Sequence, residues 1–381
     1  MKKIRTLISA LLCAILIVSL LAGCSLPSWL KPEAETPNFE ELVDFVVQAE
    51  EGREFRILQL TDTQIIDPGQ SRYPERIGNT TPLTDEDFYR DCFYYIEEAV
   101  MRTQPDLIIM TGDIVYGEFD DNGTSLQKIV AFMDSLQIPW APVFGNHDNE
   151  SAKGVTWQCQ QFEEAEYCLF KRGDMLGNSN YSIGVRQGDK LIKVIYMLDS
   201  NGCSNGKGYT LPSGEVINYN KTEKMCLMPT IGDDVLDWIG ESSQKMRTEL
   251  GYVPSKFAAF HIPTTEFVTG LNAAGYTESD NFTFPESDEL NFGTKGETIG
   301  AMNVPKFWIM MKALDFDGVF VGHRHRNNHS VVYQGIRLTF GTKSSTYDRY
   351  DRQMLGGTLI TIAEGGETFS VEHCLVEKFG E

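Results

Sequence analysis

Six side chains of the kinds that bind divalent metal ions each follow an apolar segment of this 381-residue sequence. Carboxylate oxygens and imidazole nitrogens suit zinc, manganese, iron and cobalt. Six donors are too many for one tetrahedral ion but suit two, which together can clamp both oxygens of an in-line displacement. With His147, four of the chain's six histidines lie at these positions, more than scattered core histidines would supply. The candidate ligands are Asp62, Asp113, Asn146, His261, His323 and His325.

Three of the apolar segments end in a glycine that one of these side chains follows at once. The motifs are Gly112-Asp113, Gly145-Asn146-His147-Asp148 and Gly322-His323-Arg324-His325. Glycine lets the backbone turn sharply beside a ligand, and α/β sheets place their sites at the carboxyl ends of strands. The repeated pattern predicts one pocket at the ends of several strands.

The elements that must position these residues open with a β-α-β-α-β pattern. Strands are predicted at 54–61, 106–110 and 139–144, with helices at 84–102 and 125–136. This order implies right-handed crossovers and a partly parallel sheet. Two long segments, 201–232 and 264–303, are predicted to be loop insertions that select substrate. Further strands are expected at 180–185, 191–198, 255–260, 316–321, 330–333, 336–340, 359–362 and about 368–375, and helices at 233–251 and 304–314.

Between residues 54 and 362 the motifs resemble the five ordered blocks of the calcineurin-like metallophosphoesterases. The blocks are Asp62-x-Gln64, Gly112-Asp113, Gly145-Asn146-His147-Asp148, His261 and Gly322-His323-x-His325. The later Phe340-Gly341-Thr342-Lys343 stretch is similar to the purple-acid-phosphatase-like branch. The resemblance implies an α/β fold of four layers, in which two mixed β-sheets form a sandwich flanked by helices.

The resemblance also implies a role for each matched residue. Asp62 and His325 would hold a first metal ion, and Asp113 would bridge to a second ion held by Asn146, His261 and His323. The ions would be manganese, iron or zinc, and a bridging hydroxide would attack a phosphoric ester. His147 would be the general acid or would stabilise the transition state, and Asp148 would orient its ring.

Several residues keep two interpretations. Gln64 stands where many relatives have a histidine ligand, so it could bind metal, act through water or leave the first ion loosely held. Tyr116 could ligate iron, as a similarly placed tyrosine does in purple acid phosphatases, or pack in the core. Arg324 and Arg326 could contact phosphate or form surface ion pairs. Lys343, Tyr347 and Arg349 could line the pocket rim, whereas His329 and His373 are expected to be structural.

The first 23 residues are predicted to be a signal peptide. A basic start is followed by the uncharged apolar run 7–21 and by Leu21-Ala22-Gly23-Cys24, which resembles the lipobox of bacterial lipoproteins. Cys24 would then carry the lipid, 24–50 would be the lipidated N-terminus and linker, and 51–381 the metallophosphoesterase domain. We expect a lipid-anchored protein on the outer face of a bacterial cell membrane.

The charge of the chain limits its partners. The formal net charge is −21, and signal cleavage would remove only the basic Lys2, Lys3 and Arg5, leaving −24. Such a body repels nucleic acid, so the expected substrate is a small phosphoric ester, either a monoester or a diester. The six cysteines after Cys24 could form disulfides, with Cys159–Cys168 and Cys203–Cys226 as candidates, or could be isolated buried thiols. The alternative function is a non-catalytic or single-metal surface binding lipoprotein, which only Gln64 favours.

Overall fold

The structure, a computed structural model, describes residues 37–69, 85–120, 122–203, 209–210, 214, 216–217 and 228–377. The predicted signal peptide 1–23 and Cys24 lie outside these residues. In the part of the chain that is described, no helix is long and apolar enough to cross a membrane. The folded unit described below begins at Phe39.

The predicted β-α-β-α-β opening forms the parallel half of a five-stranded sheet. Strands β2 (Phe55–Leu60), β3 (Leu107–Thr111) and β4 (Trp140–Val143) run parallel, connected through α2 (Asp85–Thr103) and α3 (Thr124–Ser135). Beyond β2, the strands β15 (Gly356–Ile362) and β16 (Phe369–Leu375) complete the sheet in antiparallel pairing. The carboxyl ends of β2, β3 and β4 therefore meet at one edge.

A second, seven-stranded sheet has the order β1-β5-β6-β9-β12-β14-β13. Its neighbours β6, β9, β12 and β14 are parallel, whereas β5 pairs antiparallel with β6 and β13 with β14. The parallel core of this sheet again brings several carboxyl ends to one edge. The strands are β1 (Phe45–Ala49), β5 (Tyr181–Gln187), β6 (Lys190–Met197), β9 (Ser255–Ala259), β12 (Phe316–Val321), β13 (Ser330–Tyr333) and β14 (Ile336–Phe340).

Alternation along the strands builds two hydrophobic cores. In β6, Ile195 and Met197 belong to the cluster that contains the five-stranded sheet, whereas Val194 and Tyr196 belong to the cluster that contains α5 (Asp233–Leu250). Successive strand residues point to opposite faces, so one strand serves both cores.

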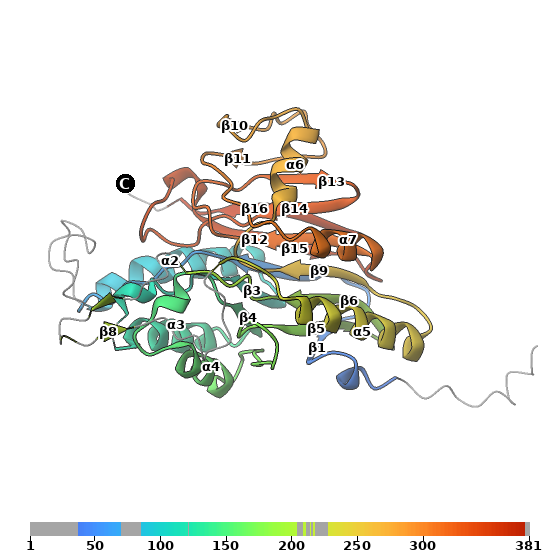
Figure 1. Ribbon diagram of the computed structural model, residues 1–381, viewed down its shortest axis with the longest axis horizontal. Helices are drawn as coiled ribbons and strands as arrows, with labels where there is room; N and C mark the ends of the chain where they lie inside the picture. The colour runs from blue at the N-terminus through green and yellow to red at the C-terminus, as the bar shows by residue number, and fades with distance from the viewer. Residues whose placement is uncertain are drawn as a thin grey trace, which may run out of the picture. The chain divides into compact units, whose positions relative to one another are not determined.

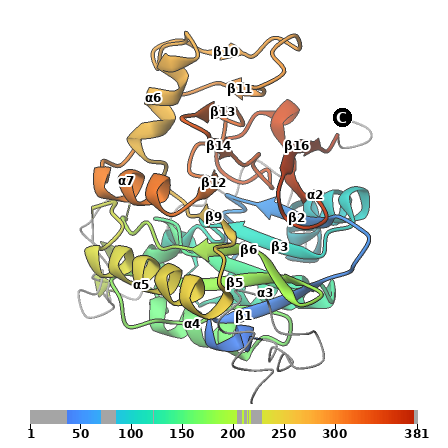
Figure 2. The same cartoon turned by 90° about the vertical axis from the view of Figure 1, so that its right-hand side faces the viewer.

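Helices cover the outer face of each sheet. Helix α2 contacts β2, β15 and β16, whereas α6 (Thr265–Ala273) contacts β13 and α7 (Pro305–Ala313) contacts β12. Figures 1 and 2 place α2 on one side of the paired sheets and α5 and α7 on the other. The prediction of two mixed sheets flanked by helices is confirmed.

Two sequence-based boundaries were wrong. Strand β1 lies within the predicted linker 24–50, yet it pairs with β5 in the seven-stranded sheet, so the folded body starts earlier than residue 51. The predicted loop 264–303 contains α6 and the paired strands β10 (Phe282–Thr283) and β11 (Thr294–Lys295). The first error concerns a short strand whose partner lies far along the chain, and the second concerns short elements inside a polar segment.

Smaller features complete the description. Helix α4 (Val155–Glu164) was not predicted, and the insertion 201–232 contributes the short pair β7 (Tyr209–Thr210) and β8 (Val216–Ile217) among its described residues. Among the described residues Cys168 forms no disulfide, so the candidate bridge to Cys159 is not formed. Cys226, and with it the second candidate bridge, lies outside the described residues.

Candidate metal centre

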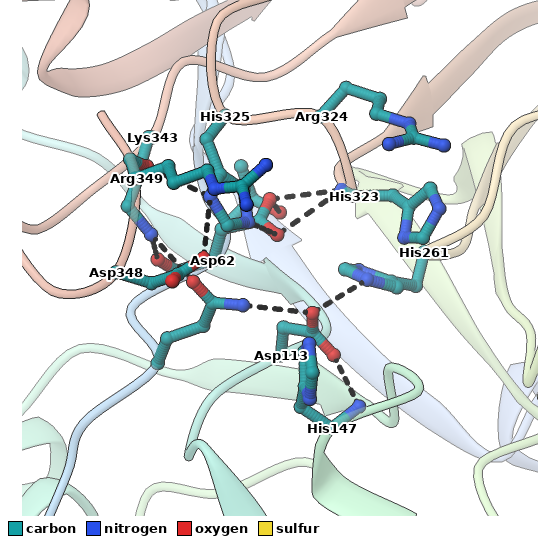
Figure 3. Close-up of polar contacts among 12 residues, drawn as sticks. Asp62, Asp113, His147, His261, His323, Arg324, His325, Lys343, Asp348 and Arg349 are labelled. Atoms are coloured by element: carbon teal, nitrogen blue, oxygen red, sulfur yellow. Dashed lines mark hydrogen bonds and ion pairs between the residues drawn. The ribbon is translucent and has the colours of Figure 1, made fainter. Parts of the chain in front are cut away.

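The predicted ligands meet at the carboxyl ends of strands from both sheets. Asp62 follows β2, Asp113 follows β3, and His261 and His323 follow β9 and β12. Figure 3 shows Asp62 beside His325 and Asp113 beside His261. In each pair, Nε2 of the histidine faces a carboxylate oxygen of the aspartate. Residues up to 263 positions apart in the sequence thus form one site, which confirms that the strand-end motifs share a location.

The backbone at this edge adopts conformations that side-chain-bearing residues rarely use. The φ angles of Asp62, Gln64, Asp113 and His323 are 53°, 43°, 50° and 78°. Such left-handed values are uncommon outside glycine and cluster at functional sites, where the surrounding structure enforces them.

Glycine is required where the chain segments approach each other. A Cβ atom on Gly322 would lie 2.6 Å from Oδ2 of Asp62, and one on Gly145 would collide with the amide nitrogen and carboxylate of Asp113. The motif glycines therefore let neighbouring backbones reach the ligands closely.

Three buried side chains form a group that fits a metal ion. Asp62, Asp113 and His261 each offer one ligand atom, and these atoms lie within 4.8 Å of one another. Nδ1 of His261 lies 2.8 Å from the Thr111 carbonyl oxygen, so it carries the proton. Nε2 then faces Oδ2 of Asp113 at 3.1 Å and is the nitrogen that would bind a metal ion after losing its proton. This is the oriented imidazole that metal sites use.

Charges within the group depend strongly on one another. Burial opposes ionisation of both carboxyls, but the nearby histidines outweigh it, so the pKa of Asp62 falls to about 2 and that of Asp113 falls well below its usual range. Burial likewise opposes protonation of His261, yet Asp113 raises its pKa to about 9. The two carboxylates therefore favour a cation, and a bound divalent ion would displace the imidazole proton.

The remaining candidate ligands surround this group. His325 lies with Nδ1 2.8 Å from the Arg349 carbonyl oxygen and Nε2 3.4 Å from Oδ1 of Asp62. Burial lowers the pKa of His323 to about 3, which keeps the imidazole neutral as a ligand must be. Asn146, 6% exposed, lines the same pocket.

Gln64 does not present its amide oxygen to the site. Its Nε2 donates to Oδ2 of Asp113 at 3.2 Å, and its Oε1 accepts from Lys343 at 2.9 Å. A ligand role for Gln64 does not fit this arrangement, because the side chain turns N–H groups toward the carboxylates. Lys343 is 1% exposed, so it is a buried residue and does not line the rim as predicted.

The partner of His147 is Glu150, which sequence reasoning missed. Oε2 of Glu150 lies 2.7 Å from Nδ1 of His147, at i+3 across the 3₁₀ turn η5 (Asp148–Glu150). Burial opposes protonation of this imidazole, but Asp113 and Glu150 raise its pKa to about 9. The ring of Tyr116 stacks on that of His147, with centroids 4.0 Å apart.

The role predicted for Asp148 was wrong. Its carboxylate accepts hydrogen bonds from the backbone N–H groups of Val115 at 2.9 Å and Gly145 at 2.7 Å, and so faces away from the His147 ring. In a 3₁₀ turn, side chains three positions apart lie on the same side, whereas adjacent side chains point in different directions. Glu150 therefore lies beside the His147 ring and Asp148 does not. Asp148 fastens the loop instead.

An open pocket extends from the candidate ligands. Of the two arginines predicted to meet phosphate, Arg324 lines this pocket, whereas Arg326 is 46% exposed and faces Glu297 at 3.9 Å. Its ion-pair interpretation therefore holds. Arg349 lines the pocket as expected. Its other lining residues include Tyr116, Asn146, His147, Cys203, Glu297, His323, His325 and Asp348.

Comparison with known proteins identifies the family. The sequence profile described as calcineurin-like phosphoesterase matches residues 55–327, which is most of the chain. The chain belongs to the calcineurin-like phosphoesterase family. The match ends just after His325 and so spans every block that carried the resemblance.

Some relatives of this phosphoesterase have names that call them inactive, and another is named a phosphatase. The probable inactive purple acid phosphatase 29 of Arabidopsis thaliana is 25% identical over 317 residues, covering 76% of this chain and 71% of that protein. Phosphatase DCR2 of Saccharomyces cerevisiae is 27% identical over 300 residues, covering 74% of this chain and 46% of its own length. The chain is thus distantly related to purple acid phosphatases, and its match spans less than half of the yeast protein.

Solved structures of similar proteins include a dimetal phosphatase from Danio rerio. It is 10% identical, with a TM-score of 0.43, and the match covers 83% of this phosphoesterase and 98% of that chain. The purple acid phosphatase PPD1 from yellow lupin is 12% identical, with a TM-score of 0.40, covering 82% of this chain and 50% of that one. Family membership comes from the sequence match and not from these scores.

Proposed function

We propose that this phosphoesterase hydrolyses small phosphoric esters with metal bound at Asp62, Asp113 and His261. The observation that carries the proposal is that Asp113 of the metal-type group and His147, oriented by Glu150, line the same pocket. His147 lines that pocket together with Asp113, and His147 N donates to Oδ1 of Asp113 at 2.8 Å. A cation and a proton donor are therefore available to the same substrate.

Each group of the chain has a distinct task. Bound metal would supply positive charge to the phosphoryl oxygens and activate water. Because Glu150 holds Nδ1 of His147, Nε2 is the nitrogen that can give a proton to the leaving oxygen. Nε2 of His325 lies 3.4 Å from Oδ1 of Asp62 and so helps to hold that carboxylate in place.

Two guanidinium groups would bind the substrate phosphate. Arg324 and Arg349 both line the pocket, and Nε of Arg324 donates to the Ile299 carbonyl oxygen at 3.1 Å, which fixes its direction. Planar guanidinium groups suit phosphoryl oxygens. We expect a phosphomonoester dianion, which carries more charge than a diester, to gain most from these two groups.

The alternative is a binding protein without turnover. The direction of the Gln64 amide supports it, as do relatives whose names call them inactive. Hydrolysis of para-nitrophenyl phosphate and its bis ester, with manganese, zinc or iron added, separates the two. We expect monoester hydrolysis that chelation abolishes and that Asp113→Asn lowers at least 100-fold. Absence of hydrolysis with every metal, in folded protein that binds metal, would establish the alternative.

Membership of the purple-acid-phosphatase-like branch is proposed from the 340–343 stretch and from the distant relatives. The sharpest test of this membership is whether Tyr116, which lines the pocket, binds iron. Iron-loaded protein with an intense visible band that Tyr116→Phe removes would support the role. A colourless active protein would leave Tyr116 as the stacking partner of His147.

Anchorage to the outer face of a bacterial membrane is proposed from the sequence alone. The basic start, the apolar run and the small residues before Cys24 support it. Membrane fractionation of the full chain and of Cys24→Ser tests it. Retention of Cys24→Ser with the membrane, in cleaved form, would contradict lipidation at this cysteine.

A further inference from the structure

A buried ammonium group lies beside the position that family resemblance gives to the first metal ion. Nζ of Lys343 donates to the Asp62 carbonyl oxygen at 2.6 Å and to Oε1 of Gln64 at 2.9 Å. The lysine is 1% exposed and Gln64 is fully buried. Figure 3 shows the Lys343 side chain reaching toward Asp62 from the β14–β15 connection.

The direction of the Gln64 amide follows from its two neighbours. An ammonium group only donates hydrogen bonds, and an ionised carboxylate only accepts them. The amide oxygen must therefore face Lys343 while the amide nitrogen faces Asp113, at 3.2 Å. Turning the oxygen toward a metal would place N–H groups against the ammonium, so Lys343 holds Gln64 in an orientation that cannot ligate.

The ammonium group also changes the electrostatics of this half of the site. A fixed positive charge in a buried, weakly screened position repels a divalent cation at close range. The other half differs, because His261 turns Nε2 toward Asp113 and its ring is held through Nδ1 by the Thr111 carbonyl oxygen.

We propose that this chain binds one metal ion, at Asp62, Asp113 and His261, and that Lys343 takes the place of the second. Lys343 is a positioning residue: its Nζ directs the Gln64 amide and lies against the Asp62 carbonyl oxygen. The inference rests on the metal site of the proposed function, but metal content decides it whether or not the protein turns over.

Equilibrium dialysis against manganese, with metal measured by mass spectrometry, provides the test. Wild type is compared with Gln64→His, with the double variant Gln64→His/Lys343→Met, and with Lys312→Met, which removes an exposed lysine of α7 as a matched control. We expect one equivalent of manganese in wild type and in Lys312→Met. We also expect one equivalent in Gln64→His, because the Lys343 ammonium group is still present in that variant. The double variant gains an imidazole and loses the repelling charge, so we expect two equivalents.

Each outcome decides the inference separately from the proposed function. Two equivalents in wild type, or none, would overturn it. A folded double variant that stays at one equivalent would overturn the role of Lys343. If the double variant does not fold, wild type and Gln64→His still decide, because a second ion in either contradicts exclusion by Lys343. One equivalent without hydrolysis would uphold the inference while the hydrolase proposal fails.

Discussion

The Glu150 carboxylate lies 2.7 Å from Nδ1 of His147 and is fully buried. A carboxylate in this position fixes the ring orientation and tautomer of a proton donor. We therefore expect Glu150→Gln to lower kcat for a phosphomonoester by about 10- to 100-fold with little change in KM. His147→Ala should lower kcat by about 100- to 10,000-fold. Steady-state kinetics on metal-loaded protein measures both effects.

The double variant isolates the coupling between these two residues. If Glu150 acts through His147, then Glu150→Gln should cost almost nothing further in the His147→Ala background. Glu164→Gln, an exposed carboxylate at the end of α4, is the matched control and should behave like wild type. Independent, multiplying losses would mean that Glu150 serves another group.

Asp148 is predicted to matter for stability and not for the proton donor. Its two oxygens accept from two backbone N–H groups, and an asparagine can accept only one of these bonds. Asp148→Asn should lower the free energy of unfolding by about 1–3 kcal/mol, since a buried N–H loses its acceptor. Chemical denaturation measures this, with Asp189→Asn in an 84% exposed turn position as control. A large fall in kcat at unchanged stability would return the ring-orienting role to Asp148.

The strand ends could be predicted because their signals are local. An apolar run followed by glycine and a polar side chain marks β12 and its histidines within about ten residues, and the predicted limits of β12, β13 and β14 match the structure. Such runs are buried on both faces, so composition alone indicates the strand. The ligands at these ends followed from the same local pattern.

The unpredicted features depend on contacts between distant segments. Lys343 meets Gln64 across 279 positions, and β1 pairs with a strand more than 130 residues away. No local pattern carries such pairings. Glu150 is different, since it is only three residues from His147. Predicting the 3₁₀ turn at 148–150 would have placed Glu150 beside the His147 ring. The sequence pattern instead favours Asp148, because it is adjacent to His147.

Close approach at the motif glycines gives a third prediction. A methyl group on Gly322 would meet Thr61 and the Asp62 carboxylate, so Gly322→Ala should displace Asp62 and weaken metal binding at least tenfold. Gly240, in helix α5, has nothing within 4 Å of its Cβ direction. Gly240→Ala should leave metal affinity unchanged and stabilise the fold by about 0.5–1 kcal/mol. Calorimetric titration with manganese and thermal unfolding compare the pair, and equal affinities would contradict the steric argument.

The pH dependence of stability should report the titration of His329, which is fully buried and packs with its ring tilted against that of Phe340. Burial lowers its pKa from 6.5 to about 3, aided by Lys295 and His373. Below pH 6.5 the unfolded chain binds a proton that the folded chain does not, so stability is fully present above this pH and falls as the pH drops toward 3.

His329→Leu keeps a similar volume and removes the titration. Between pH 6 and pH 4 its free energy of unfolding should fall less steeply than that of wild type, by up to about 1.4 kcal/mol per pH unit. Urea denaturation at several pH values measures the two slopes. Because the two proteins differ only at residue 329, a difference between the slopes in this range is assigned to the His329 imidazole. Parallel curves would mean that His329 is already protonated in the fold, in conflict with its burial beside Phe340.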